Sequence, residues 1–296
     1  MNKQLLFIHI PKTAGTSFRL AAQKYFGEEN TFYDYGFKEM ETTMSIKRYI
    51  YEEKDFYKLS QEFTKYETLF LSGHFLVAKY MPLFNTLNVI TFVRNPIEQV
   101  LSHYKHFKIH HGYKKSLKDF IKEERFKNIQ SKFLKAKPLE LFGFVGLTEE
   151  YEKSIELIND YYAINLEILQ ANINKNTKLN NELDEETLKI LQQENSDDMK
   201  LYSQAKKIFD KRVQYFEEKK VYTHIWVQEE KENLLKGIAI QKDTDDPVNV
   251  KLLINNKESI VRATNFRPGL LAHKLPRNGY VGFEYKLKKS EKVQLT

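Results

Sequence analysis

Short apolar runs alternate with amphipathic stretches over the first two thirds of the chain. Four runs of apolar and β-branched residues are short enough to be buried strands: Leu5–Ile10, Thr68–Leu71, Asn88–Val93 and Phe142–Leu147. Between them, apolar residues recur at the spacing of amphipathic helices. This alternation predicts an α/β fold in which helices flank both faces of a parallel sheet. Ligands of such sheets bind at the carboxyl ends of the strands.

The helical spacing gives approximate bounds for the helices. They are predicted within residues 18–25, 56–66, 97–107, 117–121, 126–134, 148–158, 183–191 and 195–213. The aromatic, polar and irregular stretch 31–53 is predicted to be a long loop with short helical pieces, and the polar, Asn-rich stretch near 171–181 is predicted to be a loop. From about Leu235, short β-type runs alternate with turn signals such as Asn278-Gly279. We therefore predict a first domain over residues 1–220 and a small antiparallel β module over residues 235–296.

Composition narrows the class of protein. The chain has 296 residues, of which 41% are hydrophobic, enough for one large domain or a medium domain with a small module. It contains no cysteine, which excludes disulfides, thiolate metal sites and cysteine nucleophiles. No apolar run is long enough to span a bilayer, and the first strand leaves no room for a signal peptide, so we expect a cytoplasmic protein. The net charge of +7 favours anionic partners, such as a nucleotide or a polyanionic sugar.

The first strand runs directly into a short polar loop. Pro11 ends the strand because it has no N–H to donate, Gly15 permits a turn, and a hydroxyl residue can cap the helix that follows. A strand, tight loop and helix N-terminus in this order point backbone N–H groups at one place, which suits an anion. This P-loop-like unit is not a Walker A motif, because the Gly-Lys-Ser/Thr sequence is missing. The side chains that suit a phosphate or sulfate are those of Lys12, Thr13, Thr16 and Ser17, and the last two are the candidate caps.

A second polar stretch follows the strand Asn88–Val93. Arg94 is at the strand end, Asn95 can cap a helix whose first residue is Pro96, and Ser102 lies about two turns further on. Arg94 and Ser102 could hold a phosphate beside this helix, away from the Lys12 loop. Two separate anion sites on one sheet predict a ligand with two phosphate ends. The alternative is that Arg94 pairs with a carboxylate and Ser102 faces solvent.

The histidines allow several interpretations. His74 follows a strand and suits a general base at neutral pH, although a lone histidine is often structural. His9 lies inside the first strand and is predicted to be a hydrogen-bonded core residue. The spacing of His103, His106 and His110 places them on one face of a helix, where they could bind a metal or extend the positive field. The basic stretch Lys105–Lys137 is either a groove for an acidic glycan or a solvated helix surface.

Together, the two polar stretches resemble a known family. The segment His9–Ser17 resembles the 5′-phosphosulfate loop of sulfotransferases that use 3′-phosphoadenosine 5′-phosphosulfate (PAPS), and Val93–Ser102 resembles their 3′-phosphate-binding strand and helix. The closest branch is that of carbohydrate sulfotransferases similar to the heparan/uronyl 2-O group, which also has a counterpart of Gly73-His74 and of Phe144–Glu150. The resemblance covers about residues 5–220. It departs at Ser72, where that group often has a second histidine.

The resemblance implies a PAPS-dependent sulfotransferase domain over residues 1–220. Such an enzyme moves a sulfuryl group by in-line displacement from PAPS to an acceptor hydroxyl, here of a carbohydrate, and releases 3′-phosphoadenosine 5′-phosphate (PAP). His74 and Lys12 are then catalytic, no metal is required, and no nucleic-acid partner is expected. The implied donor-binding residues are Lys12, Thr13, Ala14, Gly15, Thr16, Ser17, Arg94 and Ser102. A kinase-like phosphotransferase using the same loop and a non-catalytic glycan-binding protein remain alternatives, and the sequence does not indicate an oligomeric state.

Overall fold

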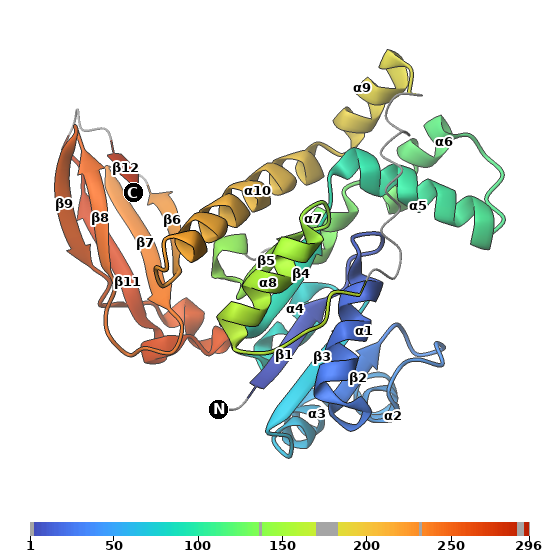
Figure 1. The fold of residues 1–296 in the computed structure, drawn as a ribbon, viewed down its shortest axis with the longest axis horizontal. Helices are drawn as coiled ribbons and strands as arrows, with labels where there is room; N and C mark the ends of the chain where they lie inside the picture. The colour runs from blue at the N-terminus through green and yellow to red at the C-terminus, as the bar shows by residue number, and fades with distance from the viewer. Residues whose placement is uncertain (1–2, 136–137, 170–182, 231–232, 289–292, 296) are drawn as a thin grey trace.

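The protein is built around a five-stranded parallel sheet (Figure 1). A computed structural model describes residues 3–135, 138–169, 183–230, 233–288 and 293–295. The strand order is β2-β3-β1-β4-β5, and every neighbouring pair is parallel. The strands are β1 (Lys3–Ile8), β2 (Thr31–Asp34), β3 (Thr68–Gly73), β4 (Val89–Val93) and β5 (Phe144–Leu147). The predicted α/β class and parallel sheet are confirmed.

Helices flank this sheet, and those predicted from the apolar spacing are present. Figure 1 shows α1 and α8 in front of the sheet, and α10 contacts β5. The longer helices are α1 (Gly15–Phe26), α3 (Phe56–Phe63), α5 (Pro96–His110), α6 (Leu117–Lys122), α7 (Ile129–Leu134), α8 (Tyr151–Tyr162), α9 (Glu185–Glu194) and α10 (Ser196–Glu217). Shorter helical pieces are α2 (Met44–Ile46), a π-helix (Lys47–Glu52) and α4 (Val77–Tyr80). Among the described residues, no helix has the length and apolar character needed to cross a membrane.

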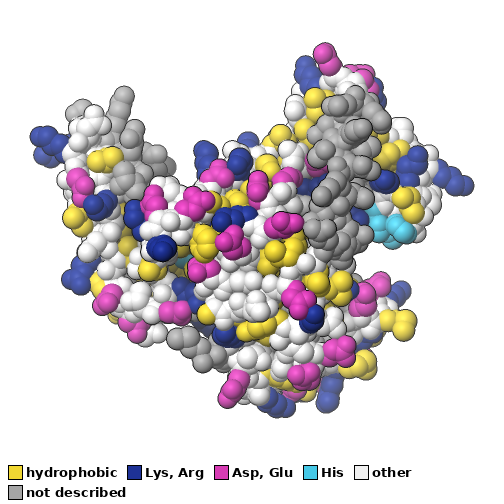
Figure 2. Space-filling view, in the orientation of Figure 1, with side chains coloured by type: hydrophobic (Ala, Val, Ile, Leu, Met, Phe, Trp, Pro, Cys, Tyr) yellow, Lys and Arg dark blue, Asp and Glu magenta, His cyan; other side chains and the backbone are white. Residues whose placement is uncertain are grey.

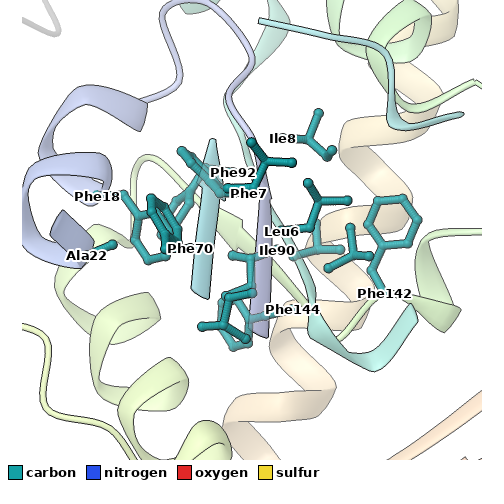
Figure 3. Packing of buried hydrophobic residues seen from close by; sticks show 14 of the residues in the cluster. Leu6, Phe7, Ile8, Phe18, Ala22, Phe70, Ile90, Phe92, Phe142 and Phe144 are labelled. Carbon is teal, nitrogen blue, oxygen red and sulfur yellow. The ribbon is translucent and has the colours of Figure 1, made fainter. Parts of the chain in front are cut away.

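Alternating side chains of β1 fix its register in the core (Figure 3). Phe7 packs against Phe18 of α1, with ring centroids 4.5 Å apart, and against Phe92 of β4. Leu6 and Ile8 lie on the opposite side of the strand (Figure 3). A shift by one residue would exchange the two faces, so this packing determines where the chain leaves the sheet. The loop after β1 is thereby held at a fixed place on the carboxyl edge.

Two predicted boundaries need correction. β1 ends at Ile8 instead of Ile10, because the N–H of Ile10 turns back to the carbonyl of Ile8. The stretch 31–53 contains the short helical pieces predicted for it, but it begins with the edge strand β2, which was not predicted. The Asp34 carboxylate at the end of β2 is buried and accepts hydrogen bonds from Lys79, Tyr51 and Tyr80. A strand held by polar contacts of this kind lacks the alternating apolar residues by which a strand is predicted, so β2 was missed. The stretch 171–181, predicted to be a loop, lies outside the described residues.

The C-terminal part forms two antiparallel sheets, as predicted. One has the order β10-β11-β7-β6 and the other β12-β8-β9. Their strands are β6 (Thr223–Glu230), β7 (Leu234–Gln241), β8 (Asn249–Ile254), β9 (Lys257–Arg262), β10 (Asn265–Phe266), β11 (Tyr280–Lys286) and β12 (Val293–Leu295). β6 pairs with β7 along its whole length, so these sheets begin before residue 235. Leu87 and Leu141 pack against Ile238 and Ile240, which joins the sheets to the first part of the chain. The division into two domains stays a prediction.

Candidate functional site

The polar residues that follow β1, β3 and β4 meet at one cavity. Its volume is about 740 Å³, and it lies at the carboxyl edge of the parallel sheet. Of the predicted site residues, those that line it are Lys12, Ala14, Gly15, Thr16, Ser17, His74, Arg94 and Ser102. The exception is Thr13, which is buried and donates its hydroxyl hydrogen to the carbonyl of Ile10. Its side chain therefore supports the loop and does not face the cavity.

The loop enters α1 through left-handed backbone conformations. Lys12 and Ala14 have φ values of 69° and 62°, and Ala14 is the N-cap residue. Within the described residues no side chain caps this helix, so the predicted capping by Thr16 or Ser17 is wrong. Thr16 is instead exposed and Ser17 is buried. Positive φ values at non-glycine residues are unfavourable and are often found at ligand-binding loops, where backbone N–H groups form a concave anion site.

Gly15 is required for close approach and not for a turn. A Cβ atom at this position would lie 2.0 Å from Cδ2 of His9. The His9 ring is buried, as predicted, and its Nδ1 lies 2.9 Å from the hydroxyl of Tyr35. Burial, and secondarily the charge of His74, lowers the pKa of His9 well below 6.5, so the ring is neutral at pH 7. The His9 ring thus lies between Gly15 of the Lys12 loop and His74 at the end of β3.

The hydrogen bonds of His74 fix its tautomer. Its backbone N–H donates to the carbonyl of Asp34, and its Nδ1 lies 2.7 Å from the carbonyl oxygen of His9. A carbonyl can only accept, so Nδ1 carries the hydrogen and Nε2 of the neutral ring has a free lone pair. His74 is exposed to the cavity, but the rings of His9 and Tyr35 lie against its ring, with centroids 4.5 and 4.8 Å away, and the resulting desolvation lowers its pKa below 6.5. At neutral pH, His74 is in the state that a general base needs.

Arg94 is held at its backbone by an amide side chain. Its N–H donates to Oε1 of Gln130 at 2.8 Å, and its carbonyl accepts from Nε2 of the same side chain at 2.9 Å. The guanidinium is 3.4 Å from the carbonyl of Lys12 and 3.5 Å from the carboxylate of Glu98. The pairing of Arg94 with a carboxylate, which the sequence left open, is therefore present, but both contacts are long and Arg94 still lines the cavity.

Two cationic side chains are close together at this edge. Burial, and secondarily the charge of Arg94, lowers the pKa of Lys12. Arg94 also reaches the Lys12 carbonyl, and Gln99, which is buried, donates from Nε2 to the carbonyl of Pro11 at 3.0 Å. The loop after β1 and the helix after β4 are thus joined directly. An anion in the cavity would relieve the repulsion between the two cations.

The turn into α5 has the predicted cap. The side chain of Asn95 accepts from the N–H of Ile97 at 3.0 Å, and Pro96 is the first helical residue. The N–H of Asn95 donates to Glu149, whose other oxygen accepts from the hydroxyl of Tyr202. The helix predicted within residues 148–158 begins only at Tyr151, so Glu149 precedes α8. Its carboxylate links the Arg94 turn to α10.

The α5 histidines differ in environment. His103 is buried with its ring near those of Phe107, Phe120 and Phe126. Burial lowers its pKa to about 4, so His103 adds no positive charge at pH 7, contrary to expectation. His106 and His110 line the cavity, and Figure 2 shows histidine side chains at the surface over α5. No group of three His, Cys, Asp or Glu residues suited to a metal occurs in the described part of the chain.

Part of the basic stretch Lys105–Lys137 is paired with acidic side chains. Lys105 lines the cavity. Four described residues of the stretch form ion pairs: Lys115 and Arg125 with Glu123, Lys118 with Glu186 and Asp184, and Lys127 with Glu124 and Glu194. These pairs fit a solvated helix surface, which was one of the two interpretations. The positive charge of the cavity comes mainly from Lys12, Arg94 and Lys105.

Comparison with known proteins gives little further information. No model of a protein family matches the chain, and no curated protein matches it. One solved structure with a similar arrangement is a sulfotransferase from Alicyclobacillus acidocaldarius. It is 14% identical, the similarity covers 71% of this chain and 97% of that chain, and the TM-score is 0.39. A likeness of this extent adds nothing to the assignment of the site.

Proposed function

We propose that this protein is a sulfotransferase that moves the sulfuryl group of PAPS to a hydroxyl of a carbohydrate. The observation that carries the proposal is that both anion-binding stretches open into one cavity with His74 on its wall. The sequence predicted two separate anion sites, whereas Arg94 is in contact with the Lys12 loop. A single nucleotide with phosphate groups at both ends of its ribose fits such a connected site. The resemblance of the two stretches to PAPS-binding motifs points the same way.

The donor would be held from two sides. Lys12 and the uncapped N-terminus of α1 bind the 5′-phosphosulfate, because N–H groups and the helix dipole favour an anion there. Arg94 and Ser102 bind the 3′-phosphate, which distinguishes PAPS from ATP. As the sulfuryl group leaves, negative charge grows on the bridging oxygen of the 5′-phosphate. The Lys12 ammonium stabilises that charge more strongly in the transition state than in the bound donor.

The acceptor hydroxyl is activated by His74. Its Nε2 takes the hydroxyl proton while the acceptor oxygen forms a bond to sulfur and the bond from sulfur to the 5′-phosphate oxygen breaks. The products are the sulfated acceptor and PAP, and the proton remains on His74 until it passes to solvent. The side chains of Lys105, His106 and His110 extend the cavity along α5 and offer polar contacts for a glycan.

Donor binding is tested first with unlabelled nucleotides. PAP is expected to raise the melting temperature more than ADP does, because only PAP has a 3′-phosphate. Arg94→Ala should weaken PAP binding by about 1.5–3 kcal/mol in calorimetry and leave ADP binding nearly unchanged. Equal shifts from PAP and ADP would contradict the proposal and favour a phosphotransferase. Transfer of labelled sulfate from PAPS over a panel of glycans then identifies the acceptor, and no transfer to any hydroxyl compound would refute the enzyme.

A further inference from the structure

Glu98 lies between the two side chains proposed to hold the 3′-phosphate. It is four residues after Arg94 and four before Ser102, so all three lie on the same side of α5 and its N-terminal turn, and all three line the cavity. Glu98 reduces the positive charge of the site and repels a phosphate. A carboxylate at this position therefore requires an explanation other than attraction of the anion.

The Glu98 carboxylate is incompletely hydrogen-bonded. Oε2 is 3.5 Å from Nη2 of Arg94, and Oε1 is buried without a hydrogen-bond partner among the described residues. A buried carboxylate oxygen without a donor is unfavourable. Oε1 itself is buried, but the side chain is 14% exposed and forms part of the cavity wall, so rotation about its last bond presents a carboxylate oxygen to a ligand. Because a carboxylate accepts hydrogen bonds only, the missing partner is a donor such as a hydroxyl group.

We infer that Glu98 accepts a hydrogen bond from the ribose 2′-hydroxyl of the donor nucleotide. This inference rests on the proposed function. The 2′-hydroxyl and the 3′-phosphate are on adjacent carbons, so a phosphate held by Arg94 and Ser102 brings the hydroxyl next to the residue between them. Glu98 then makes the site selective for a ribonucleotide over its 2′-deoxy analogue. Arg94 remains beside both anions and offsets their repulsion.

The test compares adenosine 3′,5′-bisphosphate, which is PAP, with 2′-deoxyadenosine 3′,5′-bisphosphate. Isothermal titration calorimetry on the full chain is expected to show at least about tenfold tighter binding of PAP, because hydrogen bonds to charged groups are the stronger class. In Glu98→Leu, which has no acceptor, the two ligands should bind within about twofold of each other. Glu98→Gln keeps a neutral acceptor of similar size, so it should give an intermediate ratio, and it serves if the leucine variant does not fold. Glu156→Gln, which changes an exposed carboxylate on α8, should keep the wild-type ratio.

Each outcome bears on the inference. If the wild-type protein binds PAP and its 2′-deoxy analogue equally, the inference is wrong while the proposed function stands. If Glu98→Leu weakens both ligands by the same factor and keeps their ratio, Glu98 acts only through Arg94, and the inference is again wrong. If neither bisphosphate binds more tightly than ADP, the proposed function itself fails. If the preference for PAP over its 2′-deoxy analogue is lost only in the Glu98 variants, a direct contact between Glu98 and the 2′-hydroxyl is supported.

Discussion

The fully buried histidine of β6 should make stability depend on pH. His224 lies where the C-terminal sheets meet the first part of the chain, with Nδ1 2.8 Å from the carbonyl of Glu140 and Nε2 2.8 Å from the hydroxyl of Tyr161. The carbonyl accepts from Nδ1, and Nε2 accepts from the tyrosine hydroxyl, so the neutral ring satisfies both nitrogens. Burial, followed by the positive charge of Arg212, lowers the pKa of His224 to about 3.

The sign and size of the effect follow from this pKa. In the unfolded chain the pKa of histidine is about 6.5, so between about pH 6.5 and 3 the unfolded state binds one more proton at this site than the folded state. The free energy of unfolding therefore falls as the pH is lowered, by about 1.4 kcal/mol per pH unit over that range. From pH 6.5 to 4.5 the loss from His224 alone is about 2.3 kcal/mol, because the unfolded histidine is half protonated at the start of this range. That is a large part of the stability of a typical domain.

Urea unfolding at several pH values tests this reasoning. Trp226, the one tryptophan of the chain, is two residues from His224 in β6 and provides a local fluorescence signal. His224→Asn does not titrate and keeps a donor for the Glu140 carbonyl, so it should be less stable at pH 7 but lose stability less steeply below pH 6.5. The two curves should converge by about 1.4 kcal/mol per pH unit. Parallel curves would refute the claim that His224 is held neutral in the folded protein.

Three further predictions concern the cavity. His74→Ala should lower the rate of sulfate transfer by about 10²–10⁴-fold and leave PAP affinity unchanged. The wild-type rate should rise with pH to a plateau, with a midpoint below 6.5, because desolvation lowers the pKa of His74. An active variant or a higher midpoint would contradict the role of His74 as base. Gly15→Ala should displace His9 and destabilise the protein by about 1–3 kcal/mol in urea unfolding, whereas Gly269→Ala, with open space around it, should be tolerated. Gln130→Met should weaken PAP binding about tenfold in calorimetry, because the Arg94 backbone loses two hydrogen bonds. Gln130→Glu should have an intermediate effect, and ADP binding should not change in either variant. Equal losses for PAP and ADP would argue against a specific effect on Arg94.

Local rules were sufficient where an element depends on its own residues. The strand before Arg94 and the cap at Asn95 followed from a short β-branched run and from an Asn-Pro pair. These rules failed where contacts with residues distant in the sequence determine the element. β2 is held by the polar contacts of Asp34, and α1 begins without the hydroxyl cap that its sequence offers, because Ser17 is buried and Thr16 is exposed.

The same distinction applies to the site. Lys12, His74 and Arg94 could be placed at one edge because parallel strands end there together. The groups that hold them could not be found in the same way. Gln130 is 36 residues from Arg94 in the sequence and is itself held by Asp198 of α10, whose carboxylate accepts from the Gln130 N–H at 3.1 Å. Neither residue is part of a motif that local pattern could single out.

These buried supports explain how two cations stay close together before any ligand binds. Gln99 holds the backbone before Lys12, and Gln130 holds the backbone of Arg94, so neither loop can easily retreat from the other. The fold therefore holds Lys12 where burial first, and the charge of Arg94 second, disfavour its charged form and lower its pKa. An anion bound in the cavity removes the repulsion between Lys12 and Arg94, and this adds to its affinity without any rearrangement of the loops. A site organised in this way should bind a doubly phosphorylated nucleotide more strongly than the sum of its two separate phosphate contacts.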